Sequence, residues 1–101
     1  MRHHMSRSEK DSSSRSVLYV AGFISEVEIN STGVALTSTN KITYLLDKDN
    51  AVLREKFNIW FKSCYLKAVP HSMTVIKYHI DVVDGEPKLI VDDIPSWTAA
   101  A

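Results

Sequence analysis

The sequence predicts an all-β domain with one helix, arranged as a small five-stranded Greek-key β-barrel. Three observations predict it: three strand-like runs come first, one amphipathic helix follows them, and a hairpin built around Asp84-Gly85 comes last. This order of elements is typical of small Greek-key barrels. A chain of 101 residues, 45% of them hydrophobic, is large enough for one such core.

The first strand is predicted over residues 17–29, where the side chains alternate with period two. One side of this strand carries Leu18, Val20 and Ile24, and the other carries Tyr19 and Phe23. Gly22 lies in the middle, where a strongly bent barrel strand tolerates a missing side chain.

Two shorter strands follow. Residues 30–33 read Asn-Ser-Thr-Gly and predict a turn, because these residues accept unusual backbone dihedrals. A strand over residues 34–37 follows, then a turn at residues 38–40 and a strand over residues 41–46. Asn30-Ser31-Thr32 matches a glycosylation sequon, which we interpret as a polar turn in an intracellular protein.

After residue 46 the apolar residues no longer alternate with period two but recur at helical spacing. This spacing predicts a helix that ends near Lys67. Either Asp49 or Asn50 is a competent N-cap. The face predicted to pack on the barrel contains Leu53, Phe57, Trp60, Phe61, Cys64 and Ala68. A second apolar stripe has the spacing i, i+7, i+14 and consists of Val52, Ile59 and Leu66. Pro70 then ends the helix.

The last two strands form the predicted hairpin, over residues 74–83 and from Pro87 or Lys88 to Ile94, with Asp84-Gly85 as the turn. The barrel domain is therefore expected over residues 17–95. Residues 1–16 are polar and are expected to be a disordered tail, part of which resembles a cloning remnant. Residues 96–101 are expected to form a C-terminal tail that leaves the barrel.

Two segments resemble domains of the oligonucleotide/oligosaccharide-binding (OB) fold. Residues 20–27 resemble the opening strand of OB-fold nucleic-acid-binding domains, with an apolar residue, Gly22, another apolar residue and then a bulge. Residues 82–94 look like their closing hairpin, as in replication protein A-like proteins and in bacterial replicative DNA polymerase. The resemblance implies an OB-type barrel in a complex that handles single-stranded nucleic acid in replication, repair or telomere maintenance.

Charge qualifies this expectation. The chain has 12 basic and 12 acidic residues, whereas nucleic-acid-binding modules usually carry a basic surplus. Residues 17–95 hold eight Lys or Arg and ten Asp or Glu, a net charge of −2, so the basic excess lies in the tail. A barrel of this charge gains little from counterion release when it binds phosphates.

The candidate nucleic-acid-binding residues are aromatic and basic side chains expected on one face of the barrel: Tyr19, Phe23, Lys41, Thr43, Tyr44, Lys77 and Lys88. Aromatic rings stack on bases, and lysines neutralise phosphates. The alternative is a protein-interaction domain that binds no nucleic acid itself. Its candidate contacts are the second helix stripe and one tryptophan, namely Val52, Ile59, Leu66 and Trp97.

No pattern predicts catalysis, a metal site or a cofactor. The lone Cys64 reads as a buried small hydrophobe, and His71 and His79 are separate in the predicted layout. Asp81, Asp92 and Asp93 are expected at a solvated strand edge rather than as paired catalytic carboxylates. We expect a partner subunit or a second copy of the chain, no membrane and no small-molecule substrate. The expected location is intracellular, nuclear in a eukaryote and otherwise cytoplasmic.

Overall fold

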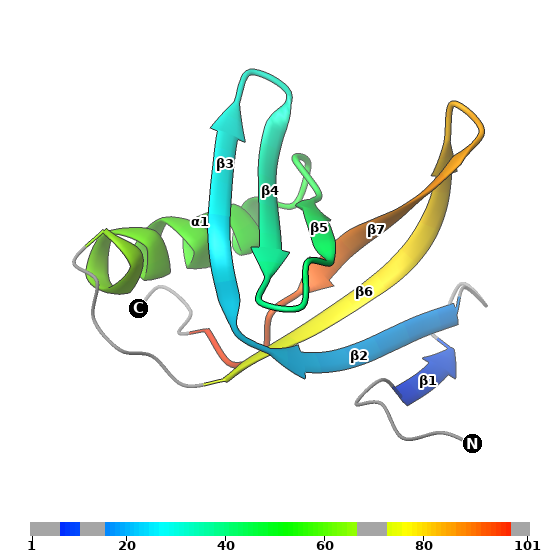
Figure 1. Cartoon of the computed structure of the whole chain (residues 1–101), viewed down its shortest axis with the longest axis horizontal. Helices are drawn as coiled ribbons and strands as arrows, with labels where there is room; N and C mark the ends of the chain where they lie inside the picture. The colour runs from blue at the N-terminus through cyan, green and yellow to red at the C-terminus, as the bar shows by residue number, and fades with distance from the viewer. Residues whose placement is uncertain (1–6, 11–15, 67–72, 98–101) are drawn as a thin grey trace.

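The computed structural model describes residues 7–10, 16–66 and 73–97 (Figure 1). Over these residues the chain forms seven strands, one α-helix and one π-helical turn. Their bounds, in chain order, are β1 Arg7–Lys10, β2 Ser16–Gly22, β3 Ile24–Asn30, β4 Gly33–Ser38, β5 Thr43–Leu46, α1 Ala51–Trp60, η1 Phe61–Tyr65, β6 Thr74–Val83 and β7 Glu86–Asp93. The prediction of an all-β chain with one helix is confirmed.

All seven strands belong to one sheet with the order β1-β2-β6-β7-β5-β4-β3. Every neighbouring pair is antiparallel except β5 and β7, which run parallel. β2 and β3 are consecutive in the chain, yet in the sheet β3 lies five positions away from β2. The β3–β4 hairpin and the β6–β7 hairpin both project toward the top of the view in Figure 1, and α1 lies behind β3 and β4.

The predicted first strand is divided into β2 and β3 at Phe23. β2 pairs with β6 and β3 pairs with β4, so the chain exchanges one neighbour for another at this point. A register shift between Ile24 and Glu26 accompanies the exchange, as is usual where a strand bends. The backbone N–H of Thr39, in the β4–β5 turn, donates to the Phe23 carbonyl at 2.9 Å. We call this place the β2–β3 bend.

The two predicted hairpin turns have different outcomes. Asp84 and Gly85 both have positive φ, 54° and 80°, as a two-residue type I′ turn requires, so this turn is confirmed. The strand predicted from residue 41 begins only at Thr43. Lys41 instead has φ 71° and its N–H donates to the Ser38 carbonyl at 2.9 Å, so it belongs to the turn.

The helix begins where the sequence indicated. Asn50 is the N-cap, because its Oδ1 accepts from the Leu53 N–H at 3.0 Å, and its Nδ2 donates to the Asp92 carbonyl of β7 at 2.9 Å. Lys56 Nζ lies 2.9 Å from Asp93 Oδ1. These contacts attach α1 to the end of β7, with its apolar face on the sheet.

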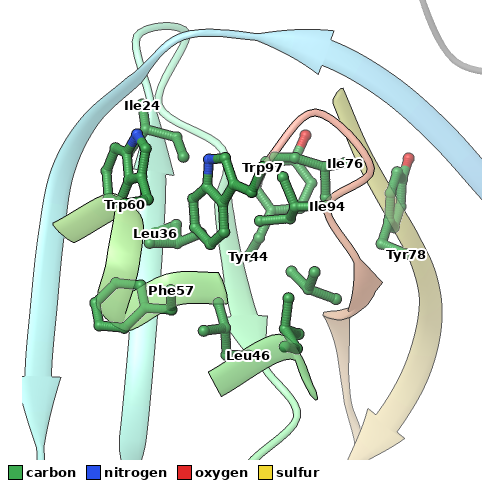
Figure 2. Packing of buried hydrophobic residues seen from close by; sticks show 12 residues of the cluster. Ile24, Leu36, Tyr44, Leu46, Phe57, Trp60, Ile76, Tyr78, Ile94 and Trp97 are labelled. Atoms are coloured by element: carbon green, nitrogen blue, oxygen red, sulfur yellow. The ribbon is translucent and has the colours of Figure 1, made fainter. Parts of the chain in front are cut away.

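The core lies between α1 and the inner face of the sheet (Figure 2). The helix contributes Leu53, Phe57 and Trp60, as predicted, and the strands contribute Ile24, Leu36, Tyr44, Leu46, Ile76, Tyr78 and Val91. Ile94 and Trp97 complete the cluster from the segment after β7. Among the helical residues predicted on this face, Phe61 and Cys64 are half-buried, and Ala68 lies outside the described residues.

The helix continues beyond Trp60 as a π turn, in which the Leu66 N–H donates to the Phe61 carbonyl at 2.9 Å. A π turn holds about one residue more than an α turn, so the residues after it are rotated relative to a continuous α-helix. The rotation brings Tyr65 onto the core, where its ring stacks on Phe61 at 5.4 Å. Leu66 is exposed, but it is turned out of line with Val52 and Ile59.

Trp97 corrects two expectations. It lies beyond the predicted end of the domain, yet it is only 7% exposed and its ring stacks on Trp60 at 4.8 Å (Figure 2). Burial of a large aromatic surface outweighs the polar character of the preceding turn, so the chain folds back onto the core. Trp97 is therefore a core residue and does not form one surface with Val52 and Ile59.

The N-terminal residues differ in part from the expectation of a disordered tail. Arg7–Lys10 form β1, antiparallel to β2, with Arg7 opposite Tyr19 and Glu9 opposite Val17. An edge strand offers unpaired backbone groups, and a polar segment can pair with them without burying apolar side chains. Residues 1–6 and 11–15 lie outside the described residues.

Candidate protein-interaction surfaces

The predicted nucleic-acid-binding residues do not converge on one face. Tyr19 and Lys77 are register partners on β2 and β6, with the Lys77 ammonium 6.0 Å from the Tyr19 ring centroid. Phe23 and Lys41 lie at the β2–β3 bend and in the β4–β5 turn beside it. Thr43 lies on β5, where its hydroxyl is 3.2 Å from that of Thr37. The predicted residues therefore occupy separate places.

Two of the candidate lysines have an acidic neighbour. Lys41 Nζ lies 4.0 Å from Glu26 Oε2, and Lys88 Nζ lies 3.3 Å from Glu86 Oε1. Surface ion pairs of this kind add little to stability, but they offset the positive charge that a phosphate would meet. The arrangement does not concentrate positive charge as a phosphate-binding surface would.

Tyr44 corrects the prediction of an exposed stacking residue. Its side chain points into the core, is 4% exposed and packs edge-on against Tyr78 at 5.4 Å between ring centroids. Side chains alternate along β5, so that Tyr44 and Leu46 face the core and Thr43 and Leu45 face outward. Burial, and after it the neighbouring Tyr78, raises the pKa of the Tyr44 hydroxyl above its ordinary value of 10.0.

A groove of about 590 Å³ lies between the two projecting hairpins, and we call it the hairpin groove. Its lining includes the aliphatic residues Val34, Ala35, Leu45, Leu46, Val83 and Ile90. Its polar lining residues are Asn30, Thr32, Asp47, Lys48, His79 and Asp81. Among the described residues that line it there is no Phe, Tyr or Trp, and none of the predicted nucleic-acid-binding residues.

Several aliphatic side chains of the β6–β7 hairpin and of β3 are exposed. Ile80, Val82 and Val83 are 53%, 67% and 43% exposed, and Ile29 at the end of β3 is 55% exposed. Of these residues of β6, Val83 lines the hairpin groove, whereas Ile80 and Val82 alternate with the groove-lining residues and face the other side of the hairpin, where Val82 is the register partner of Pro87. Sequence reasoning missed this surface because a strand pattern does not reveal how far a hairpin extends beyond the core.

His79, which lines the hairpin groove, is paired with Asp92. His79 Nδ1 lies 2.9 Å from both carboxylate oxygens of Asp92, and the two side chains are 9% and 18% exposed. Asp93 accepts from Lys56. The prediction of a solvated edge is therefore wrong for Asp92, which pairs with His79, whereas the Asp93 side chain is 39% exposed and meets solvent beside Lys56.

A second hollow, of about 280 Å³, opens at the β2–β3 bend, and we call it the bend cavity. It is lined by Val20, Ala21, Gly22, Phe23, Ile24, Ser38, Thr39, Asn40, Tyr44, Met73 and Ile76. It shares no lining residue with the hairpin groove. It brings together two of the predicted binding residues, Phe23 at its edge and Tyr44 at its inner wall.

Among the described residues, no three His, Cys, Asp or Glu side chains gather closely enough to hold a metal ion. Within the same ranges, no helix combines the length and the apolar character needed to cross a membrane.

Comparison with models of protein families, with curated proteins and with solved structures finds no match to this chain.

Proposed function

We propose that this chain is an OB-type module that binds a protein partner within an assembly handling single-stranded nucleic acid. The strand order supports the OB assignment. The order β2-β6-β7-β5-β4-β3 starts and ends with two halves of one bent strand, β5 pairs parallel to β7, and the helix stands between β5 and β6. This is the order expected of a five-stranded Greek-key barrel whose first strand serves both ends.

The chemistry of the hairpin groove carries the choice of a protein partner. Aliphatic side chains line it, among them the 43% exposed Val83 of the β6–β7 hairpin, and the acidic Asp47 and Asp81 line it together with Lys48. Nucleic acid would need aromatic rings for stacking and a surplus of cations, whereas a polypeptide can bury aliphatic side chains against this surface. The reference to nucleic acid rests on the resemblance of residues 20–27 and 82–94 to OB domains.

Fluorescence anisotropy of labelled oligo-dT, titrated with the protein at two salt concentrations, tests the proposal. We expect no binding at micromolar protein even at low salt, because Lys41, Lys56 and Lys88 each have an acidic neighbour. Salt-sensitive binding at micromolar protein would overturn the preference for a protein partner.

A second candidate function is favoured by one contact. The Tyr19 ring on β2 and the Lys77 ammonium on β6 lie close together. Arg7 of β1 is the register partner of Tyr19 on the other side of β2. An aromatic ring beside a cation is suited to contact a base and a phosphate. If oligo-dT binds, Lys77→Glu should weaken binding and reduce the steepness of its salt dependence, whereas Lys62→Glu on the helix should not.

A further inference from the structure

The two ends of the sheet differ in how their edges are protected. β3, at one end of the strand order, carries its own charged residues, Glu26 and Glu28, and both are exposed. Near the other end, β2 has no charged residue between Ser16 and Gly22. Proteins block pairing between exposed sheet edges with charged side chains on the edge strand. β2 by itself lacks this protection.

β1 occupies the edge of β2. It consists of Arg-Ser-Glu-Lys, so three of its four residues are charged, and it pairs antiparallel with residues 16–19. Figure 1 shows β1 outside β2 at the margin of the sheet, and β1 is the terminal strand of the order. β1 therefore supplies charged residues at an edge where β2 has none.

β1 covers only part of β2. Among the described residues, the register pairs between them end at Tyr19, whereas β2 continues to Gly22 and pairs with β6 over residues 18–22. The last three residues of β2, Val20 to Gly22, are partly exposed. A strand that paired with all seven residues of β2 would satisfy backbone groups that β1 leaves unpaired.

β2 is complementary to itself. It is uncharged, reads Ser-Val-Leu-Tyr-Val-Ala-Gly, and is rich in residues that favour strands. When two copies of β2 pair antiparallel, one register alone matches all seven residues. In this register Ser16 lies opposite Gly22, and Tyr19 lies opposite its own equivalent in the other copy. Between the ends of the strand every residue then faces an apolar or aromatic partner, and no like charges meet.

We infer that β1 is a removable strand covering the β2 edge, and that its release allows β2 to pair with β2 of a second copy of this chain. The pairing forms a two-fold symmetric dimer with Tyr19 at its axis, and the sheet continues from one copy into the other. Association stops at the dimer, because the contact uses the same edge of both copies. This edge is separate from the hairpin groove, whose described lining residues include none from β2.

Proline substitutions in β1 test the inference in the full chain. Ser8→Pro/Glu9→Pro, which we call the released variant, removes two backbone N–H groups and fixes two φ angles, so β1 should leave β2. At about 100 µM protein, sedimentation velocity should show a monomer for the wild-type protein and a dimer for the released variant. His3→Pro/His4→Pro, upstream of β1, is the matched control and should sediment like the wild-type protein.

Charge substitutions in the released variant locate the contact. Tyr19→Lys places two ammonium groups opposite each other at the dimer axis, so it should restore the monomer. Tyr19 is partly exposed, so a lysine at this position is compatible with the fold. Ile29→Lys is the matched control, because Ile29 is 55% exposed on β3 at the other end of the sheet. It should leave the dimer intact.

Amide hydrogen exchange of the wild-type protein tests the removal of β1 without any substitution. The amides of β1 should exchange at least about a hundredfold faster than those of the central strand β6, because β1 can separate while the remaining strands stay paired. Equal protection of β1 and β6 would show that β1 leaves only when the whole chain unfolds, and would overturn the inference.

The sedimentation results that would overturn it are equally definite. They are a released variant that stays monomeric, a wild-type protein that dimerises as strongly as the released variant, a dimer that survives Tyr19→Lys, or a dimer that is lost with Ile29→Lys. A released variant that unfolds would also overturn it, because β1 would then be an obligatory strand. These outcomes are separate from the oligo-dT titration, since sedimentation without nucleic acid reports on the β2 edge whether or not the hairpin groove binds a protein.

Discussion

At the scale of single residues, Trp97 combines extensive packing with an unsatisfied donor. Its ring contacts Trp60 and Phe57, and its Nε1 is the one buried side-chain N or O atom among the described residues for which no hydrogen-bond partner is present. Trp97→Ala should lower the free energy of unfolding by about 3–5 kcal/mol, because it leaves a large cavity. Trp97→Phe should cost less than half as much, since it keeps a ring and removes a donor that bonds to nothing.

Urea unfolding followed by circular dichroism measures both variants. Equal destabilisation by the two substitutions would contradict this account, because the indole N–H would then contribute through a bond that the packing does not reveal.

Asn50 makes two contacts that can be separated by substitution. Asn50→Ala loses both the cap to Leu53 and the bond to the Asp92 carbonyl, so the free energy of unfolding should fall by about 1–2 kcal/mol. Asn50→Asp keeps a cap acceptor but has no amide donor for that carbonyl, so it should give an intermediate loss. Asp49→Ala is the matched control and should change stability little, because Asn50 provides the cap. An Asp49→Ala loss as large as that of Asn50→Ala would refute the assignment of the cap.

Tyr44 gives a prediction for alkaline stability. Burial raises its pKa in the folded state above the ordinary value of 10.0, so the unfolded chain releases the Tyr44 proton first as pH rises. The stabilising contribution is complete below pH 10 and is lost as pH rises above it. The free energy of unfolding of the wild-type protein should therefore decline more steeply than that of Tyr44→Phe above pH 10. Parallel declines in denaturant titrations between pH 9 and pH 11 would contradict the prediction.

At the scale of elements, the attachment of α1 to β7 depends on one ion pair with unequal partners. The Lys56 side chain is 11% exposed and that of Asp93 is 39% exposed. Asp93→Ala leaves a nearly buried ammonium without its carboxylate and should cost about 1–3 kcal/mol. Lys56→Met removes the charge, keeps the apolar stem and leaves Asp93 in contact with water, so it should cost less than about 1 kcal/mol. Thermal unfolding of the two variants should show this order, and the reverse order would contradict it.

The elements also show where sequence patterns succeed. The period-two run over residues 74–83 and the Asp84-Gly85 turn together predicted β6 with its observed bounds, because a type I′ turn fixes the register of both strands. The same register places His79 opposite Ile90, as observed. The register set by the turn could not predict which residues of β6 lie opposite Asp92 and Asp93, because an irregularity between Lys77 and Tyr78 shifts the pairing beyond that point.

The helix shows the opposite case. Its N-cap and buried face follow from local chemistry, but the i, i+7, i+14 stripe assumes a constant α-helical rotation. Stacking among Phe61, Tyr65 and Trp60 accompanies the π turn, and the change in rotation separates Leu66 from Val52 and Ile59. Tertiary packing of aromatic rings decides this geometry, so the residue spacing alone could not predict it. The candidate Tyr44 failed for a different reason, since period-two alternation groups it with Leu46 but does not show that this side of β5 faces the core.

At the scale of the whole molecule, the folding unit differs from the predicted domain at both ends. β1 lies at the end of the strand order and pairs with β2 alone, whereas Trp97 is part of the core. A fragment of residues 16–97 should therefore fold and retain most of the stability of the full chain, with a modest loss because the 2% exposed Val17 loses its register partner Glu9. A fragment of residues 16–95 should lose about a further 3–5 kcal/mol, because it lacks the indole that stacks on Trp60. Urea unfolding of the two fragments beside the full chain measures the difference. If the shorter fragment were as stable as the longer one, Trp97 would not belong to the core, and if neither folded, β1 would be an obligatory strand of the sheet rather than an addition to its edge.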